Sequence, residues 1–255
     1  MQVDLNSDMG ESFGPWRMGD DAALLNIITS ANIACGFHAG DADVMAATMR
    51  QAVKNGVGIG AHPGFADLQG FGRRRIRLSA EELGHLVAYQ LGAAQAMARL
   101  AGGRVRHLKL HGALANMASE DGSIARACYQ AALAVDPDII LVTLAATQSE
   151  ATARDLGAAY ANEIFADRAY NDDATLVDRS QPGAVLHDPA IAGERMERMI
   201  RAGGIVTQSG KVIPCRIDTI CVHGDSPDAV AMAGAVRNHL QGAGIALRQF
   251  SGQRA

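Results

Sequence analysis

Short apolar runs alternate along the chain with longer stretches in which apolar residues recur every three or four positions. The short runs are typical of buried strands, and the longer stretches are typical of helices that cover a sheet. We predict strands over 2–6, 30–35, 57–61, 104–110, 138–144, 159–165, 204–207, 218–222 and 245–248.

Several of the predicted helices have recognisable ends. Ser79, with Glu82 three residues later, has the pattern of a capping box. A helix over 43–55 is expected to stop at Gly56, and Ser-Pro-Asp at 226–228 is expected to open another helix. Strand and helix thus alternate at roughly 30 residues per unit, which predicts a parallel sheet with crossover helices.

The number of units favours one architecture. About seven or eight units, with no shift in composition to mark a linker, predict a single domain over 1–255 that closes into an α/β, (β/α) TIM-like barrel. A doubly wound open sheet is the main alternative. The stretch 208–217 is expected to be a hairpin insertion.

Some of these strands carry polar residues where a buried parallel strand should be apolar. In the first strand, Asp4, Asn6 and Asp8 share one face because side chains alternate with period two. Lys109, one of three lysines in the chain, shares a face with two histidines. Burying its ammonium group without a partner would cost several kcal/mol, so we expect a counter-charge or a water-filled space beside it.

Four of the eight histidines follow a predicted strand and precede a glycine within two positions: His38, His62, His111 and His223. The carboxyl ends of parallel strands form the rim where α/β folds place their chemistry. We therefore predict that these four side chains share one site. The others, which we interpret as structural or solvated, are His85, His107, His187 and His239.

Two long loops add charged candidates. The loop 62–75 contains Arg73 and Arg74, and is either an exposed basic turn or a lid that offers an arginine to an anion. The loop 166–183 begins with Asp167 and Arg168. This pair is either a structural salt bridge or part of the rim, where arginine suits a carboxylate or phosphate.

Composition excludes several classes of function. The net charge of −4 gives no basic field for nucleic acid, and no apolar run reaches the roughly 18 residues of a membrane span. The first residues lack the pattern of a signal peptide, and the four cysteines show no CxxC spacing. These features predict a reducing cytoplasm, in which Cys35 and Cys221 pack as small hydrophobic residues.

Common cofactor motifs are missing from the sequence. It contains no HExxH, no P-loop of the form GxxxxGK[ST] and no GxSxG. A divalent metal held by residues from separate strands, for example Asp8, His38 and His62, stays open.

Six blocks together resemble one known family: DLNSDMGESFG (4–14), SANIACGFHAGD (30–41), GAHPGFADLQGFGRR (60–74), KLHGAL (109–114), EIFADRAY (163–170) and CVHGDSP (221–227). In this order they resemble the LamB/YcsF family over essentially the full chain. Three positions depart from the usual family pattern, which has cysteine at Ser7, proline at Leu110 and tyrosine at Ala115. Ser7 argues against a catalytic thiol at that position.

The resemblance implies an activity. Members of this family are described as the A subunit of prokaryotic 5-oxoprolinase, which opens the lactam of 5-oxoproline to glutamate at the expense of ATP, together with subunits B and C. It also implies a seven-stranded barrel similar to those of sugar deacetylases. Because no P-loop is present, we expect ATP to bind mainly to a partner subunit or to an unconventional site.

We assign roles to the candidates as hypotheses. Asp8 or Glu11 would act as general base, and Lys109 would stabilise an oxyanion or phosphoryl oxygens. The four rim histidines would share proton transfer, and Arg168 would hold the substrate carboxylate. The remaining substrate-site candidates are Asn6, Asp41, Arg73, Arg74, Glu163, Asp167 and Asp225, of which Asp41 and Asp225 would orient histidines.

Two other classes of function remain as alternatives. One is a metal-dependent deacetylase or amidohydrolase that acts alone, which the barrel type and the Asp/His rim would permit. The other is a non-catalytic scaffold that binds 5-oxoproline or partner subunits, which would leave the buried lysine unexplained. A homo-oligomer is compatible with either.

Overall fold

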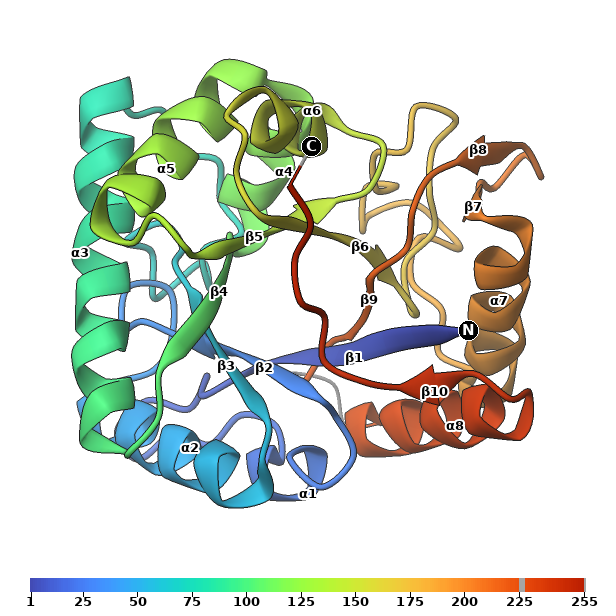
Figure 1. The fold of residues 1–255 in the computed structure, drawn as a ribbon, viewed down its shortest axis with the longest axis horizontal. Coiled ribbons are helices and arrows are strands. Elements are labelled where there is room, and N and C mark those ends of the chain that lie inside the picture. The colour runs from blue at the N-terminus through green and yellow to red at the C-terminus, as the bar shows by residue number, and fades with distance from the viewer. Residues whose placement is uncertain (225–227, 255) are drawn as a thin grey trace.

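The computed structural model, which describes residues 1–224 and 228–254, is built around a closed barrel of seven parallel strands (Figure 1). Each strand pairs with the next, and the last strand pairs again with the first. The barrel strands, in order around the barrel, are β1 (Gln2–Met9), β2 (Ser30–Ala34), β3 (Gly58–His62), β4 (Val105–Lys109), β5 (Ile140–Leu144), β6 (Tyr160–Phe165) and β9 (Thr219–Val222). The predicted closed barrel is confirmed, and the open-sheet alternative is wrong.

Helices surround the barrel on its outer side (Figure 1). Their bounds are α1 (Asp21–Leu24), α2 (Ala42–Asn55), α3 (Ala80–Leu100), α4 (Gly112–Glu120), α5 (Gly122–Val135), α6 (Gln148–Asp155), α7 (Pro189–Ala202) and α8 (Ala229–Gly242). The predicted ends of two helices are confirmed, because Ser79 and Glu82 form a reciprocal capping box and Gly56 ends α2 in the left-handed conformation. No helix within 1–224 or 228–254 combines the length and the apolar character that a membrane crossing requires.

Two predicted strands lie outside the barrel. The run at 204–207 forms β7 (Gly204–Val206), which pairs in antiparallel fashion with β8 (Val212–Pro214). The hairpin therefore begins at β7, earlier than the predicted 208–217. The run at 245–248 forms β10 (Ala246–Leu247), which pairs with the first residues of β1. β9 pairs with β1 farther along and thereby closes the barrel, so β10 is not one of the barrel strands. β7 pairs with β8 in the hairpin and is not one of them either.

The chain after β10 closes one end of the barrel. It crosses the barrel from β10 toward β5 and β6 (Figure 1), and Gln253 forms a bridge with Tyr160. Phe250 packs inside against the apolar side chains of β5 and β6, which are Ile140, Val142 and Ala161. This apolar plug fills the end of the barrel from which the strands start, and leaves the opposite rim for the polar groups.

Candidate active site

The inward-facing residues of β1 form successive polar levels within the barrel. At the lowest level, Asp4 is fully buried and accepts hydrogen bonds from Thr29 at 2.6 Å, Ser30 at 2.7 Å and Thr219 at 2.5 Å. Burial raises the pKa of Asp4 to about 6, even though these hydroxyl groups favour its charged form. The neighbouring strands thus satisfy a carboxyl group that could not otherwise be buried.

One level higher, an amide network crosses the barrel. Asn6 Nδ2 donates to Glu163 at 3.0 Å, and Asn32 Nδ2 donates to Asn6 Oδ1 at 2.7 Å. His107 Nε2 lies 2.9 Å from Asn32 Oδ1, so this nitrogen carries a proton and donates it to the amide oxygen. His107 therefore belongs to the interior network, in agreement with its interpretation as a structural residue.

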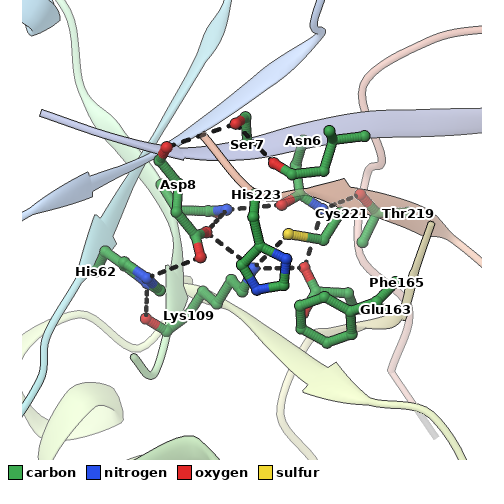
Figure 2. Close-up of polar contacts among 12 residues, drawn as sticks. Asn6, Ser7, Asp8, His62, Lys109, Glu163, Phe165, Thr219, Cys221 and His223 are labelled. Carbon is green, nitrogen blue, oxygen red and sulfur yellow. Dashed lines mark hydrogen bonds and ion pairs between the residues drawn. The ribbon is translucent and has the colours of Figure 1, made fainter. Parts of the chain in front are cut away.

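Lys109 occupies the next level, at the end of β4. Its Nζ atom lies 2.9 Å from Asp8, 2.8 Å from Glu163 and 3.0 Å from the sulfur of Cys221 (Figure 2). The ring of Phe165 adds a cation–π contact, with its centroid 5.0 Å from Nζ. The counter-charge expected from the sequence is therefore present, and it consists of two carboxylates.

The charges of this trio shift one another's pKa values. Burial would lower the pKa of Lys109, but the adjacent Asp8 and Glu163 raise it well above its usual range. Burial would raise the pKa of Asp8, but His62 and Lys109 lower it well below its usual range. For Glu163, burial prevails over the attraction of Lys109 and raises the pKa. Asp8 is thus held as a carboxylate, and Glu163 has the greater tendency to take up a proton.

Three of the four rim histidines form a cluster beside Asp8. His62 Nδ1 lies 2.8 Å from the carbonyl oxygen of Lys109, and His111 Nε2 lies 2.8 Å from that of Phe71. The other ring nitrogens, His62 Nε2 and His111 Nδ1, lie 3.0 Å apart, and His62 Nε2 is 3.3 Å from Asp8 Oδ2. The His38 ring stacks on His111, with centroids 3.7 Å apart.

His38 is the least satisfied member of this cluster. Its side chain is 1% exposed, and neither ring nitrogen has a hydrogen-bond partner among residues 1–224 and 228–254. Burial, together with His111 and His62, lowers the pKa of His38 well below its usual range, so the ring is neutral. Burial likewise lowers the pKa of His111, to about 3. Gly72 allows this packing, because a Cβ at its left-handed φ of +62° would lie 2.8 Å from atoms of both side chains.

The fourth histidine, His223, follows β9 and stacks on Phe165, with centroids 5.2 Å apart (Figure 2). Its Nδ1 lies 2.7 Å from the Asp167 carboxylate, so this nitrogen carries the proton, while Nε2 accepts from Arg179 at 3.2 Å. His223 lowers the pKa of Asp167, although burial alone would raise it. Asp167 and Arg179 thus fix the orientation of the ring.

These groups line a single cavity of about 500 Å³ at the rim. Most of the predicted catalytic residues are on its wall: Asp8, Glu11, His62, Lys109, His111 and His223. His38 lies behind His111, in contact with the cluster. The cavity wall also includes Glu163, Arg73 and Arg168, together with Arg179. The structure thus brings together residues from β1, β3, β4, β6 and β9.

Other predicted residues lie elsewhere. Asp41 caps α2, where it accepts from the backbone N–H of Val44 at 2.8 Å, rather than orienting a rim histidine. Arg74 points to the surface and pairs with Asp67. Asn6 lies below the cavity within the amide network. Asp225 and the predicted helix start at 226–227 fall outside the described residues.

Arg168 has less freedom than a substrate clamp would require. Its Nη2 donates to the carbonyl oxygen of Val177 at 2.6 Å, and its Nε lies 3.4 Å from that of Ala184. These bonds fasten the loop after β6, although the side chain still borders the cavity. Asp167 contributes by orienting His223, a role that the sequence interpretation gave to other carboxylates.

Comparison with known proteins identifies the family. A sequence model of the LamB/YcsF family matches residues 3–255. The chain belongs to the LamB/YcsF family. The 5-oxoprolinase A subunit of Ruegeria pomeroyi is 65% identical over 98% of both chains, and that of a Rhodopseudomonas palustris strain is 54% identical over 99% of this chain and 100% of its own.

Solved structures agree with this assignment. The crystal structure of a lactam utilization protein from Thermus thermophilus is 42% identical and covers 98% of this chain and 100% of its own, with a TM-score of 0.92. A peptidoglycan N-acetylglucosamine deacetylase domain from Eubacterium rectale, at 9% identity and a TM-score of 0.52, covers 98% of this chain and 88% of its own. At that identity the likeness concerns the fold alone.

Ser7, where the LamB/YcsF family usually has cysteine, faces away from the polar interior. Its hydroxyl donates to the carbonyl oxygen of Val222 at 2.7 Å and thereby joins β1 to β9. Cys221 is the cysteine whose thiol contacts Lys109 in the site, contrary to its interpretation as a hydrophobic packing residue. The same period of two that marked Asp4, Asn6 and Asp8 places Thr219 and Cys221 on the inner face of β9, and this signal was available in the sequence. On β2, Asn32 likewise faces the interior, where its side chain contacts Asn6 and Asp8.

Proposed function

We propose that this chain is the subunit of an ATP-dependent 5-oxoprolinase that opens the lactam of 5-oxoproline to glutamate, with formation of ADP and phosphate. Its partners would be subunits B and C. The names of the relatives and of the Thermus structure support this proposal. The relatives are named for 5-oxoprolinase and the Thermus structure for lactam utilization, and the Ruegeria pomeroyi relative and the Thermus structure each match this chain over 98% of its length.

The chemistry of the substrate explains the need for ATP. A lactam amide is stabilised by resonance, and ring closure is favoured because the amine is tethered to the carboxyl group. Water therefore needs an activated carbonyl carbon. Transfer of a phosphoryl group from ATP to the lactam oxygen would supply one and release ADP. Water then attacks the carbon and the C–N bond breaks as the nitrogen takes up a proton, and a second water cleaves the resulting acyl phosphate to the carboxylate and phosphate.

The observation that carries the proposal is the buried Lys109 ammonium on the cavity wall, 2.9 and 2.8 Å from Asp8 and Glu163. A fixed positive charge in a site screened from water stabilises developing negative charge on a lactam or phosphoryl oxygen. The two carboxylates keep the lysine protonated and fix its position. A scaffold that only binds a ligand has no need of such an arrangement.

We assign the proton acceptor for water to a carboxylate of this wall. Asp8 and Glu11 were the candidates from the sequence, and Glu163 joins them because its raised pKa makes it a stronger base than Asp8. The same carboxyl group would then pass this proton to the departing lactam nitrogen, while His223, held by Asp167, would position Arg179.

We assign the recognition of anionic groups to arginines of the loops that follow β3 and β6. Arg73 and Arg179 both border the cavity and come from the loops after β3 and β6. Guanidinium groups suit the planar carboxylate of 5-oxoproline and the oxygens of a phosphoryl group. Arg168 supports this wall by fastening the second loop.

Nucleotide binding and location complete the proposal. Since the sequence contains no P-loop, we assign most contacts with ATP to subunits B and C. We also place the reaction in the cytoplasm, where the four cysteines would stay in the unpaired state seen in the structure.

A reconstitution tests this function. The chain is combined with subunits B and C, 5-oxoproline and ATP, and glutamate and ADP are measured with each component omitted in turn. We expect glutamate only in the complete mixture. Formation of glutamate without this chain, or release of acetate from an acetylated sugar by this chain alone, would contradict the proposal.

A further inference from the structure

We propose that Glu11, His38, His62 and His111 form a binding site for one divalent transition-metal ion of the zinc type. Each residue offers one ligand atom, and these atoms all lie within 4.8 Å of one another. All four side chains are buried. The inference rests on these residues alone and does not depend on the lactam chemistry proposed above.

The orientation of two rings is that of metal ligands. A carbonyl oxygen only accepts hydrogen bonds, so the contacts with Lys109 and Phe71 place the protons on His62 Nδ1 and His111 Nε2. Histidines that bind metals usually donate their second ring N–H to a backbone carbonyl or a carboxylate, which fixes the tautomer. Here two histidines do so at once.

That arrangement directs two lone pairs at each other. With these tautomers, His62 Nε2 and His111 Nδ1 both present lone pairs at a separation of 3.0 Å. Such a contact is repulsive unless a positive group lies between or beside the two nitrogens. Either one shared proton or one metal ion would satisfy it, and the position of His38 decides between them.

His38 has no role in a pair that merely shares a proton. Both of its nitrogens lack a hydrogen-bond partner among the residues that the structure describes, and the side chain is 1% exposed. An unsatisfied buried polar group of this kind destabilises the folded protein. A metal ion would use one of these nitrogens as its third imidazole ligand.

The surrounding charge suits a cation. Glu11 supplies a carboxylate oxygen to the group, and Asp8 Oδ2 lies 3.3 Å from His62 Nε2. Three imidazoles and a carboxylate are the donor set preferred by zinc and similar ions, whereas calcium and magnesium favour oxygen ligands. The set differs from the Asp8, His38 and His62 combination considered from the sequence, because Asp8 Oδ1 is engaged by Lys109 and Asn32.

Metal content and affinity test this site without any activity assay. The purified chain is stripped with a chelator, dialysed, and titrated with Zn²⁺ in a calorimeter, and with Co²⁺ while the visible spectrum is recorded. We expect one ion per chain and a cobalt spectrum with nitrogen ligation. His38→Gln should weaken binding by more than the roughly 10–100-fold that loss of a supporting residue typically costs, and so should Glu11→Gln.

The matched control is His85→Gln, which removes an exposed imidazole of α3 and should leave both stoichiometry and affinity unchanged. Circular dichroism of each stripped variant shows whether it is folded. Absence of stoichiometric binding by the wild-type chain would overturn the site and leave the shared proton as the explanation. Equal affinity of wild type, His38→Gln and Glu11→Gln would overturn it too, since the ion would then bind elsewhere.

Discussion

Lys109 and its two carboxylate partners show how strongly neighbouring residues depend on one another within this barrel. The ammonium group neutralises part of the charge of Asp8 and Glu163, which both approach it within 2.9 Å. Removing the lysine alone would leave two buried carboxylates without their cation. Such a loss is costlier than the net contribution of the ion pair itself.

We predict that Lys109→Met lowers the free energy of unfolding by about 3–5 kcal/mol at pH 8, because it leaves buried charge without a partner. Adding Glu163→Gln to this variant should recover part of the loss, since one of the two charges is then removed. Urea denaturation of both variants measures the effect. A double variant less stable than Lys109→Met would show that the charge of Glu163 is not the cause.

Asp4 gives a prediction about pH. Its pKa in the folded state is about 6, against 3.8 ordinarily, so the folded protein binds this proton more tightly than the unfolded chain. The stability that this group contributes is therefore fully present below pH 3.8 and is lost as the pH rises through 6. A shift of this size corresponds to about 3 kcal/mol.

The variant Asp4→Asn carries no proton that can be lost in this range. The free energy of unfolding of the wild type minus that of Asp4→Asn should thus fall by about 2.4 kcal/mol between pH 4 and pH 7.5. Denaturant unfolding of both proteins at several pH values gives this difference. Parallel stability curves would contradict the raised pKa.

At the scale of elements, periodicity located the barrel strands correctly and also identified most of the polar site. Alternation along β1 and β4 predicted which side of each strand carries Asp8 and Lys109, because a strand turns every second side chain to the same face. It did not predict how β7 would pair, since a short apolar run fits a hairpin as well as a barrel strand. Pairing is settled by closure of the whole sheet.

Loops were less predictable than strands. The sequence showed that 62–75 was long and basic, but only tertiary contacts decide that Arg73 borders the cavity while Arg74 pairs with Asp67. The role of Gly72 in the same loop likewise depends on its neighbours. A Cβ there would lie 2.8 Å from His38 Cβ and from His111 Cδ2.

We predict that Gly72→Ala disturbs the histidine cluster and lowers glutamate formation by the reconstituted enzyme at least about tenfold, because the histidines must shift to make room. Gly102→Ala is the matched control, because Gly102 also has a positive φ, of +81°, but no atom within 4 Å of the added Cβ among the described residues. Both variants should lose about 1 kcal/mol or more of stability from backbone strain. Equal activity of the two would show that the loop does not position the histidines.

For the whole molecule, the family resemblance and the residue patterns led to the same site by separate routes. The patterns alone predicted a rim of histidines with a buried lysine, and the structure places Lys109 and three of these histidines on the wall of one cavity, with His38 stacked behind His111. What no pattern supplied was the pairing of His223 with Asp167 and the approach of Cys221 to Lys109. Those contacts join segments far apart along the chain, and they follow from closure of the barrel.

The central claim is that the Lys109 ammonium stabilises negative charge while the lactam opens, and one measurement tests it most directly. Glutamate formation is followed in the reconstituted enzyme with Lys109→Ala, with Lys54→Ala as a control on the exposed side of α2. We expect Lys109→Ala to lose at least about 100-fold in rate, the usual effect of removing one such stabilising group, and to regain part of it with added ethylamine. Full activity of Lys109→Ala without the amine, in protein shown to be folded, would contradict the account.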